Sequence, residues 1–248
     1  MGFLSKLGIG IGSTSRGVSR PIQGNNHSRT PGAPVVATGT TRALEMHETT
    51  RISNGLKELL WNLDGLGRGT LLDLGPAWQT TLSFFIERGF RVSSEDILRA
   101  WKGFLAQEEL RLQQAGETHD SLDMTPNGRA ARFLESNLQY SPSSFDAVLL
   151  WDLLDYLEPA LGKQVITCLT DLLRPGGVVF AMFHSKKPEG FQRYRVADSN
   201  TLQVLSTPPL CPAQKVFQNR EIQDLFSRFR TMKSFVSRDQ LRETLFIK

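Results

Sequence analysis

The feature that most constrains this chain is an apolar run that ends in an acid and a glycine. Residues 70–72 lead into Asp73-Leu74-Gly75, and a segment with helix-like apolar spacing follows at once. In open parallel sheets, ligands bind at such strand-to-helix junctions, outside the carboxyl ends of the strands. A glycine there lets a ligand approach the backbone because no Cβ lies in the way. The chain is therefore predicted to be an α/β protein that binds a cofactor at this junction.

Size and charge limit what else the chain can be. With 248 residues, of which 40% are hydrophobic, it can bury one substantial core, and a second full domain is not expected. The net charge of +4 is uneven, because five cations and no acid precede Glu45, so the remainder carries a net charge of −1. Nucleic-acid binding needs a clustered basic face, and the folded part is not expected to have one.

The first 41 residues differ in composition from the rest. They are rich in Gly, Ser, Thr, Pro and Arg, a composition that buries too little apolar surface to offset the entropy of ordering. We expect a disordered basic tail over residues 1–41 and a folded domain over residues 42–248. An organelle transit peptide and a weak membrane-surface anchor are the alternatives, since the apolar cluster at the start is too short for a membrane span.

Cysteines and histidines indicate neither a disulfide framework nor a metal site. The two cysteines, Cys168 and Cys211, fit a reduced compartment, and a cytoplasmic location is expected. The four histidines show no metal-ligand spacing. We therefore expect no metal, no nucleic-acid partner and no transmembrane segment, and the sequence sets no oligomeric state.

Hydrophobic periodicity predicts strands and helices in alternation. Helices are expected where apolar residues recur at helical spacing, and strands where short apolar runs end in turn residues. Residues 130–134 fit either a strand or a helix, and residues 97–127 form a helical insertion. The predicted helices lie over 43–63, around 82–86, over 97–116, around 161–172 and over 219–229; the predicted strands lie over 70–72, 90–92, 145–150, 178–183, 232–237 and 241–247, the last two as an antiparallel hairpin.

In this order, the elements resemble the class I S-adenosylmethionine-dependent methyltransferases over about residues 44–248. Each matching segment is a common pattern by itself, but their order and spacing together are fairly specific. The segments are Thr70-Leu71-Leu72-Asp73-Leu74-Gly75, Gly89-Phe90-Arg91-Val92 through Asp96, Phe145-Asp146-Ala147-Val148 with Leu154-Asp155-Tyr156-Leu157, and Leu172-Leu173-Arg174-Pro175-Gly176-Gly177.

The resemblance implies a fold and a cofactor. The fold is a three-layer, doubly wound, mostly parallel sheet of seven strands with a C-terminal antiparallel hairpin, which is Rossmann-like. The cofactor is S-adenosylmethionine, at the carboxyl ends of the first two strands. Asp96 would accept hydrogen bonds from its ribose hydroxyls, with Glu95 as the adjacent candidate and a helix cap as the alternative role for Asp96. The implied cofactor-binding residues are Asp73, Gly75, Ala77, Asp96, Asn137 and Trp151.

The first loop departs from the family's Asp-x-Gly-x-Gly-x-Gly pattern. Ala77 and Gln79 stand where the second and third glycines are expected. A side chain costs about 1 to 2 kcal/mol wherever the backbone needs a positive φ. The departure leaves open whether the loop is reshaped or no longer binds the cofactor.

Methyl transfer places few demands on catalytic side chains. Holding donor and acceptor in line can supply about 7 to 11 kcal/mol, and a base helps if the acceptor is a hydroxyl or an amine. Asp152 and His184 are the candidate catalytic residues, because they follow the fourth and fifth strands. Other candidates for the acceptor side are Asp155 and Lys186 in the same loops and Trp151, Tyr194 and Arg195 as pocket walls.

We therefore predict an S-adenosylmethionine-dependent methyltransferase that acts on a small-molecule acceptor. Two other classes stay open. One is a methyltransferase-like binding or scaffold protein without catalysis, which the changed loop favours. The other is a nucleic-acid methyltransferase that uses the basic tail.

Overall fold

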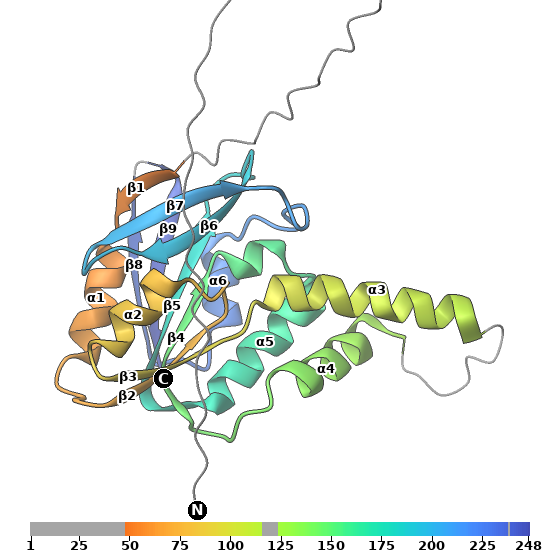
Figure 1. The fold of residues 1–248 in the computed structure, drawn as a ribbon, viewed down its shortest axis with the longest axis horizontal. Coiled ribbons are helices and arrows are strands. Elements are labelled where there is room, and N and C mark those ends of the chain that lie inside the picture. Colours follow the sequence, from red (N-terminus) through yellow and green to blue (C-terminus); the bar gives the residue numbers. More distant parts are fainter. Residues whose placement is uncertain (1–47, 116–123, 238) are drawn as a thin grey trace, which may run out of the picture. The chain divides into compact units, whose positions relative to one another are not determined.

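The structure alternates strands and helices along most of the chain (Figure 1). The computed structural model describes residues 48–115, 124–237 and 239–248. The strands are β1 (Glu48–Ile52), β2 (Gly69–Asp73), β3 (Phe90–Ser94), β4 (Phe145–Trp151), β5 (Leu173–His184), β6 (Phe191–Val196), β7 (Thr201–Thr207), β8 (Thr231–Val236) and β9 (Leu241–Ile247). The helices are α1 (Asn54–Leu63), α2 (Gln79–Ile86), α3 (Ile97–Ala115), α4 (Pro126–Asn137), the 3-10 helix η1 (Leu153–Tyr156), α5 (Pro159–Leu172) and α6 (Asn219–Leu225).

Strand order gives the topology of the main sheet. Its six strands lie in the order β3-β2-β4-β5-β9-β8. The first four are mutually parallel, and β9 pairs with β5 and with β8 in antiparallel fashion. The fold is therefore a doubly wound, mostly parallel α/β sheet with an antiparallel C-terminal hairpin, which confirms the predicted class.

Both faces of the main sheet are buried. Along β4, Leu149 packs into the layer with α1 and α2, whereas Leu150 packs into the layer with α3, α4 and α5. The same alternation holds in β5, where Phe180 and Phe183 face opposite layers. Figure 1 shows the helices on the two sides of the sheet. The continuous apolar runs in the sequence reflect this two-sided burial, as is usual in parallel sheets.

Local signals fix the helix ends near the sheet. Ser53 accepts a hydrogen bond from the Leu56 N–H at 2.9 Å and so caps α1. Gly89 ends the first crossover with φ +87°, and a Cβ there would lie 2.6 Å from the Gly67 carbonyl oxygen, so only glycine fits. The cap of α6 is Gln218, in a capping box with Glu221, and Asn219 is the first helical residue.

Two predictions about secondary structure are wrong. Residues 43–63 were expected to be one helix, but Glu48–Ile52 is the strand β1, since Thr49, Thr50 and Ile52 favour extended backbone and pair with β7. The sheet has six strands and not seven, because residues 130–134 lie in α4 and no further strand borders β3 in the described part of the chain. Proline at the start of α4 and the Thr125 cap set this helix.

A second, three-stranded antiparallel sheet, which the sequence did not predict, has the order β1-β7-β6. We call it the covering sheet. It touches the carboxyl ends of several main-sheet strands: the Val196 N–H donates to Thr81 Oγ1 at the start of α2, and Arg193 reaches Asp96 after β3. Figure 1 shows β6 and β7 across one end of the main sheet. The expected ligand-binding edge therefore lies under β6.

The expected tail over residues 1–41 lies outside the described residues. The helical insertion contains α3 and the start of α4, with residues 116–123 outside the described part. Among the described residues, no helix is long and apolar enough to cross a membrane, and no group of three or more His, Cys, Asp or Glu side chains is placed to hold a metal ion.

Candidate functional site

The loop after β2 is organised by Asp73. One carboxylate oxygen, Oδ1, accepts hydrogen bonds from the Gly75 N–H at 2.9 Å and from Trp151 Nε1 at 2.7 Å. A Cβ on Gly75 would lie 2.9 Å from the Trp151 ring and 3.2 Å from Asp73 Oδ1. The close approach that the glycine permits is thus made here by the Trp151 indole. Asp73 ties the end of β2 to the end of β4.

Ala77 and Gln79 do not strain this loop. Neither residue has a positive φ, and Gln79 is the first residue of α2. Its side-chain amide donates to Ser83 on the same helix at 2.9 Å. The missing glycines therefore carry no backbone penalty of the kind that a left-handed conformation would impose.

Backbone strain occurs instead at Trp151. Its φ is +53°, at the bulge where the register between β4 and β5 shifts. A non-glycine residue in this region costs on the order of 1 to 2 kcal/mol. The hydrogen bond to Asp73 offsets this cost, and the indole also stacks on the Tyr194 ring with centroids 6.1 Å apart and planes 13° apart. Trp151 is held over Gly75 by side chains from two sheets.

The predicted ribose acid, Asp96, lies directly after β3 and is already paired. Its Oδ1 lies 3.2 Å from Arg193 Nη2 on β6, and it accepts from the Arg99 N–H at 3.3 Å. Asp96 thus performs the helix-capping role that the sequence left as its alternative. The adjacent Glu95 is turned elsewhere, because its Oε1 accepts from the Tyr140 hydroxyl at 2.6 Å. Of the two acids, Asp96 lies beside β6 and the site.

Burial makes Asp73 an unusual carboxyl group. Burial raises its pKa from 3.8 to about 6, against the lowering effect of the hydrogen bonds from Trp151 and Gly75, and the charge of Asp96 raises it further. Its second oxygen, Oδ2, is buried and has no hydrogen-bond partner in the described part of the chain. A buried acceptor without a donor is costly to keep. The end of β2 therefore presents an oxygen that can accept from a cationic or N–H group.

A second polar cluster lies at the ends of β4 and β5. His184 Nδ1 lies 2.9 Å from Asp155 Oδ2, and the His184 backbone N–H donates to the same oxygen at 2.8 Å. Asp152 Oδ2 is 3.9 Å from the same ring nitrogen and 3.4 Å from the Tyr194 hydroxyl. The structure thus brings together Asp152 and His184, which the sequence proposed, and adds Asp155 as the partner that orients the imidazole.

The environment shifts the pKa of each group in this cluster. Burial raises the pKa of Asp152 to about 7, with Asp155 raising it and His184 lowering it. Burial also raises the pKa of Asp155, against its hydrogen bonds from His184. For His184, burial acts to lower the pKa, but the Asp155 hydrogen bond and the charges of Asp152 and Asp155 raise it above 6.5. With its pKa of about 7, Asp152 can exchange a proton near neutral pH, as acid–base chemistry requires.

A cavity of about 590 Å³ opens beside His184. Gln192 on β6 lines it, together with the residues that follow β5 and the turn between β8 and β9. Its volume falls within the range of small-molecule sites. Its charged lining residues are Arg51, Lys186, Lys187, Glu189 and Asp239. Lys186 therefore lies where the sequence placed it, on the wall of a cavity that includes His184.

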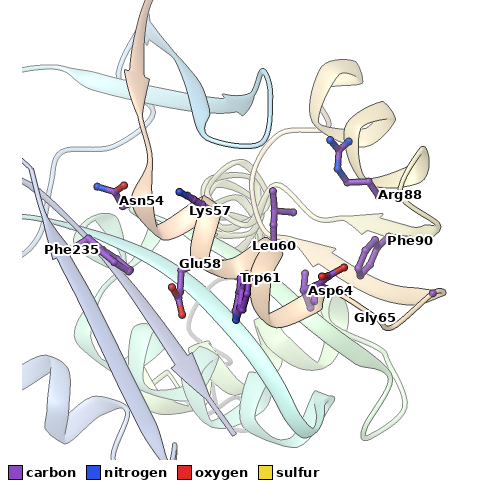
Figure 2. Close-up of a pocket in the computed structure, with 12 residues that line it drawn as sticks. Asn54, Lys57, Glu58, Leu60, Trp61, Asp64, Gly65, Arg88, Phe90 and Phe235 are labelled. Atoms are coloured by element: carbon purple, nitrogen blue, oxygen red, sulfur yellow. The ribbon is translucent and has the colours of Figure 1, made fainter.

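A larger cavity, of about 830 Å³, lies away from the predicted site residues. Figure 2 shows Trp61 and Glu58 from α1 on one side of it and Phe90 and Arg88 on another. The loop that precedes β2, at the amino end of that strand, also lines it through Gly65. None of the predicted cofactor or catalytic residues lines this cavity. Size alone therefore does not locate the site.

The remaining predicted residues lie in different places. Asn137 ends α4, and its side-chain amide donates to the Phe133 carbonyl of the same helix at 2.8 Å, so its role in cofactor binding stays a prediction. Tyr194 and Arg195 lie in β6 and not in a loop; Tyr194 is buried against Trp151, whereas Arg195 pairs with Glu48. Arg193 was missed, although Arg193 and Arg195 alternate with Tyr194 and Val196, a pattern compatible with a strand.

Comparison with known proteins gives fold likenesses only. No family model matches the chain, and no curated protein matches it. The 1,6-didemethyltoxoflavin-N1-methyltransferase of Burkholderia thailandensis, solved with S-adenosylhomocysteine and 1,6-didemethyltoxoflavin bound, is 15% identical, with 79% of each chain covered and a TM-score of 0.40. A SAM-dependent methyltransferase from Aquifex aeolicus is 12% identical over 79% of this chain and 90% of that one, with a TM-score of 0.41.

A third solved structure, an S-adenosylmethionine-dependent methyltransferase from Mesorhizobium loti, is 12% identical over 77% of this chain and 96% of that one, with a TM-score of 0.41. The solved structures that this chain is similar to therefore include the family whose motifs its sequence resembles. These likenesses are distant, so the strand order and the site geometry carry the arguments that follow.

Proposed function

We propose that the protein is an S-adenosylmethionine-dependent methyltransferase for a small-molecule acceptor. The observation that carries the proposal is the meeting of two polar groups at the carboxyl edge of one parallel sheet. Asp73 and Asp96 lie at the ends of β2 and β3, and the Asp155–His184 pair lies at the ends of β4 and β5. A ligand site is expected at this edge in open α/β sheets.

The residues at the ends of β2 and β3 fit the cofactor chemically. Asp96 offers a partly exposed carboxylate to the two ribose hydroxyls, since 19% of its side chain is exposed. The partnerless Asp73 Oδ2 can accept from the ammonium of the methionine part. When bound there, the cofactor would supply an activated methyl group. Trp151 now fills the space before Gly75, with Tyr194 stacked on it, so binding requires these rings to shift.

The His184 cluster supplies proton transfer. Because Asp155 holds Nδ1, the other ring nitrogen, Nε2, is the one left to take a proton from an acceptor in the adjoining cavity. Asp155 acts as a positioning residue, since it fixes the ring and stabilises its charged form. Asp152, with its pKa of about 7, lies near enough to share this charge. A hydroxyl or amine acceptor gains most from such a base.

The test is methyl transfer from S-adenosylmethionine carrying a deuterated methyl group. Purified protein is incubated with small hydroxyl and amine compounds, and mass spectrometry follows labelled products and S-adenosylhomocysteine. We expect turnover of at least one acceptor, lowered about 100-fold or more in His184→Gln. Absence of product and of S-adenosylhomocysteine binding in a folded protein would contradict the proposal.

A second candidate is a non-catalytic binding module, which one observation favours. Three side chains of the chain itself, Trp151, Arg193 and Tyr194, occupy the places where a cofactor would be received. A module of this kind would keep the rings packed and bind no S-adenosylhomocysteine. The binding measurement therefore separates the two candidates.

A further inference from the structure

The covering sheet closes the cofactor end of the site through specific contacts. On β6, Arg193 is 11% exposed and places Nη2 3.2 Å from Asp96 Oδ1. Its guanidinium carbon lies 4.8 Å from the centroid of the Phe191 ring, a cation–π distance that holds the side chain in place. Arg193 thus neutralises the Asp96 carboxylate, which is the group expected to accept hydrogen bonds from the ribose of the cofactor.

The next residues of β6 extend this closure along the edge. The Tyr194 ring is buried against Trp151, which fills the space in front of Gly75. Two residues further, the Val196 N–H donates to Thr81 Oγ1 at 2.9 Å, next to the start of α2. β6 therefore contacts the elements that follow β2 and β3 and the end of β4. Because three residues of one strand make these contacts, the closure does not depend on a single pair of side chains.

We propose that β6 is an intramolecular cover, in which Arg193 competes with the cofactor for Asp96 and must leave before the cofactor binds. The inference rests on the proposed function, because it concerns access to the same site. Its consequence is an apparent affinity that is reduced by the fraction of molecules in which the cover is closed. Removing the competing cation then raises the affinity, whereas removing a residue that contacts the cofactor lowers it.

The chain offers a matched control for this competition. Arg195 lies two residues further along the same strand, but it pairs with Glu48 at 2.9 Å and with Gln203, away from Asp96. Arg193→Ala and Arg195→Ala each remove one arginine from β6, and only the first frees Asp96. Arg193→Gln is a second variant that retains more side-chain volume if the alanine variant folds poorly.

The experiment is calorimetric titration with S-adenosylhomocysteine of the full-length wild type and these variants. Hydrogen exchange over residues 191–207 is measured in parallel without ligand. We expect Arg193→Ala and Arg193→Gln to bind about five- to thirtyfold more tightly than wild type, and Arg195→Ala to bind within about twofold of it. Exchange should rise in β6 of the Arg193 variants more than in Arg195→Ala.

The outcomes separate the two proposals. If wild type binds and the Arg193 variants bind equally or more weakly, Arg193 is no competitor and the cover is overturned while the proposed function stands. If wild type fails to bind and the Arg193 variants bind, both proposals are supported. If no folded form binds, the proposed function fails, and the cover fails with it.

Discussion

The carboxyl edge of the main sheet has an open half and a closed half. At the ends of β4 and β5, His184 borders a cavity of about 590 Å³. At the ends of β2 and β3, Asp96 is paired with Arg193, and Trp151 and Tyr194 stack over the first loop. The difference teaches that the acid–base half borders a cavity through His184, whereas the groups that suit the cofactor are bonded to, or packed against, side chains of their own chain. β6 then controls access to the closed half of the edge, and not the chemistry of the residues there.

The largest expected effect concerns the open half. His184→Gln should lower the rate of methyl transfer about 100- to 10,000-fold, because it removes the imidazole that we propose takes the acceptor proton. The affinity for S-adenosylhomocysteine should change by less than about twofold, since His184 lies at the other half of the edge. Steady-state kinetics beside calorimetry measure both quantities. Equal losses in rate and affinity would show that the two halves are not separate.

Substitutions in the closed half should lower the free energy of unfolding more than substitutions in the open half. Tyr194→Ala leaves a cavity against Trp151 and should lower the free energy of unfolding by about 3 to 5 kcal/mol. Tyr194→Phe keeps the stacking and loses only long contacts with Asp152 and Gln192, so about 1 kcal/mol or less is expected. Urea denaturation measures both variants. Equal losses would mean that the hydroxyl, and not the stacked ring, holds the strand down.

A prediction about pH compares acids from both halves. The folded pKa values of Asp73 and Asp152, about 6 and about 7, lie above their ordinary 3.8, so the folded state binds more protons than the unfolded state in this window. Stability must then fall as pH rises. The raised pKa of His184 acts in the same direction, because its contribution is lost as pH rises through that value.

The free energy of unfolding should accordingly fall by about 2 kcal/mol or more between pH 5 and pH 8. Asp152→Asn should reduce this fall, since it removes the buried acid whose pKa is raised to about 7. Urea denaturation at several pH values tests the prediction. A stability that rises over this interval would contradict the assignment of raised pKa values to these acids.

The smallest effect is expected at the outer part of the covering sheet. Arg195 and Glu48 form an ion pair with side chains 22% and 42% exposed. Such pairs contribute about 0.2 to 1 kcal/mol, so Arg195→Ala should destabilise the protein by no more than that. Thermal or urea unfolding gives the value. A loss above about 2 kcal/mol would show that the outer part holds the cover as firmly as Tyr194 does.

The main sheet could be predicted from the sequence because its signals are local. A few neighbouring residues suffice to predict each of its elements. Examples are the run that ends at Asp73, the turn at Gly89 and the apolar strands β4 and β5. β1 was missed for the opposite reason. Its pairing with β7 joins segments about 150 residues apart, and neither strand alone gives a distinctive pattern.

The sequence proposes residues for the site but not the contacts that they make. Asp73, Asp96, Asp152 and His184 could be proposed from the resemblance and from their positions along the chain, and their roles stay predictions. The pairing of Asp96 with Arg193 depends on the fold of the covering sheet, and no spacing in the sequence encodes it. Trp151 was expected beside the cofactor, and only the geometry shows that it fills the space before Gly75.

The most direct test of the central claim is calorimetric titration of wild type, Asp96→Ala and Glu95→Gln with S-adenosylhomocysteine. Glu95 is the matched control, because it lies next to Asp96 and bonds to Tyr140 instead of facing β6. We predict binding by wild type and Glu95→Gln and a loss of about 10- to 150-fold in Asp96→Ala. Equal binding by all three proteins, or binding by none of them and by neither Arg193 variant when folded, would contradict the placement of the cofactor at the end of β3.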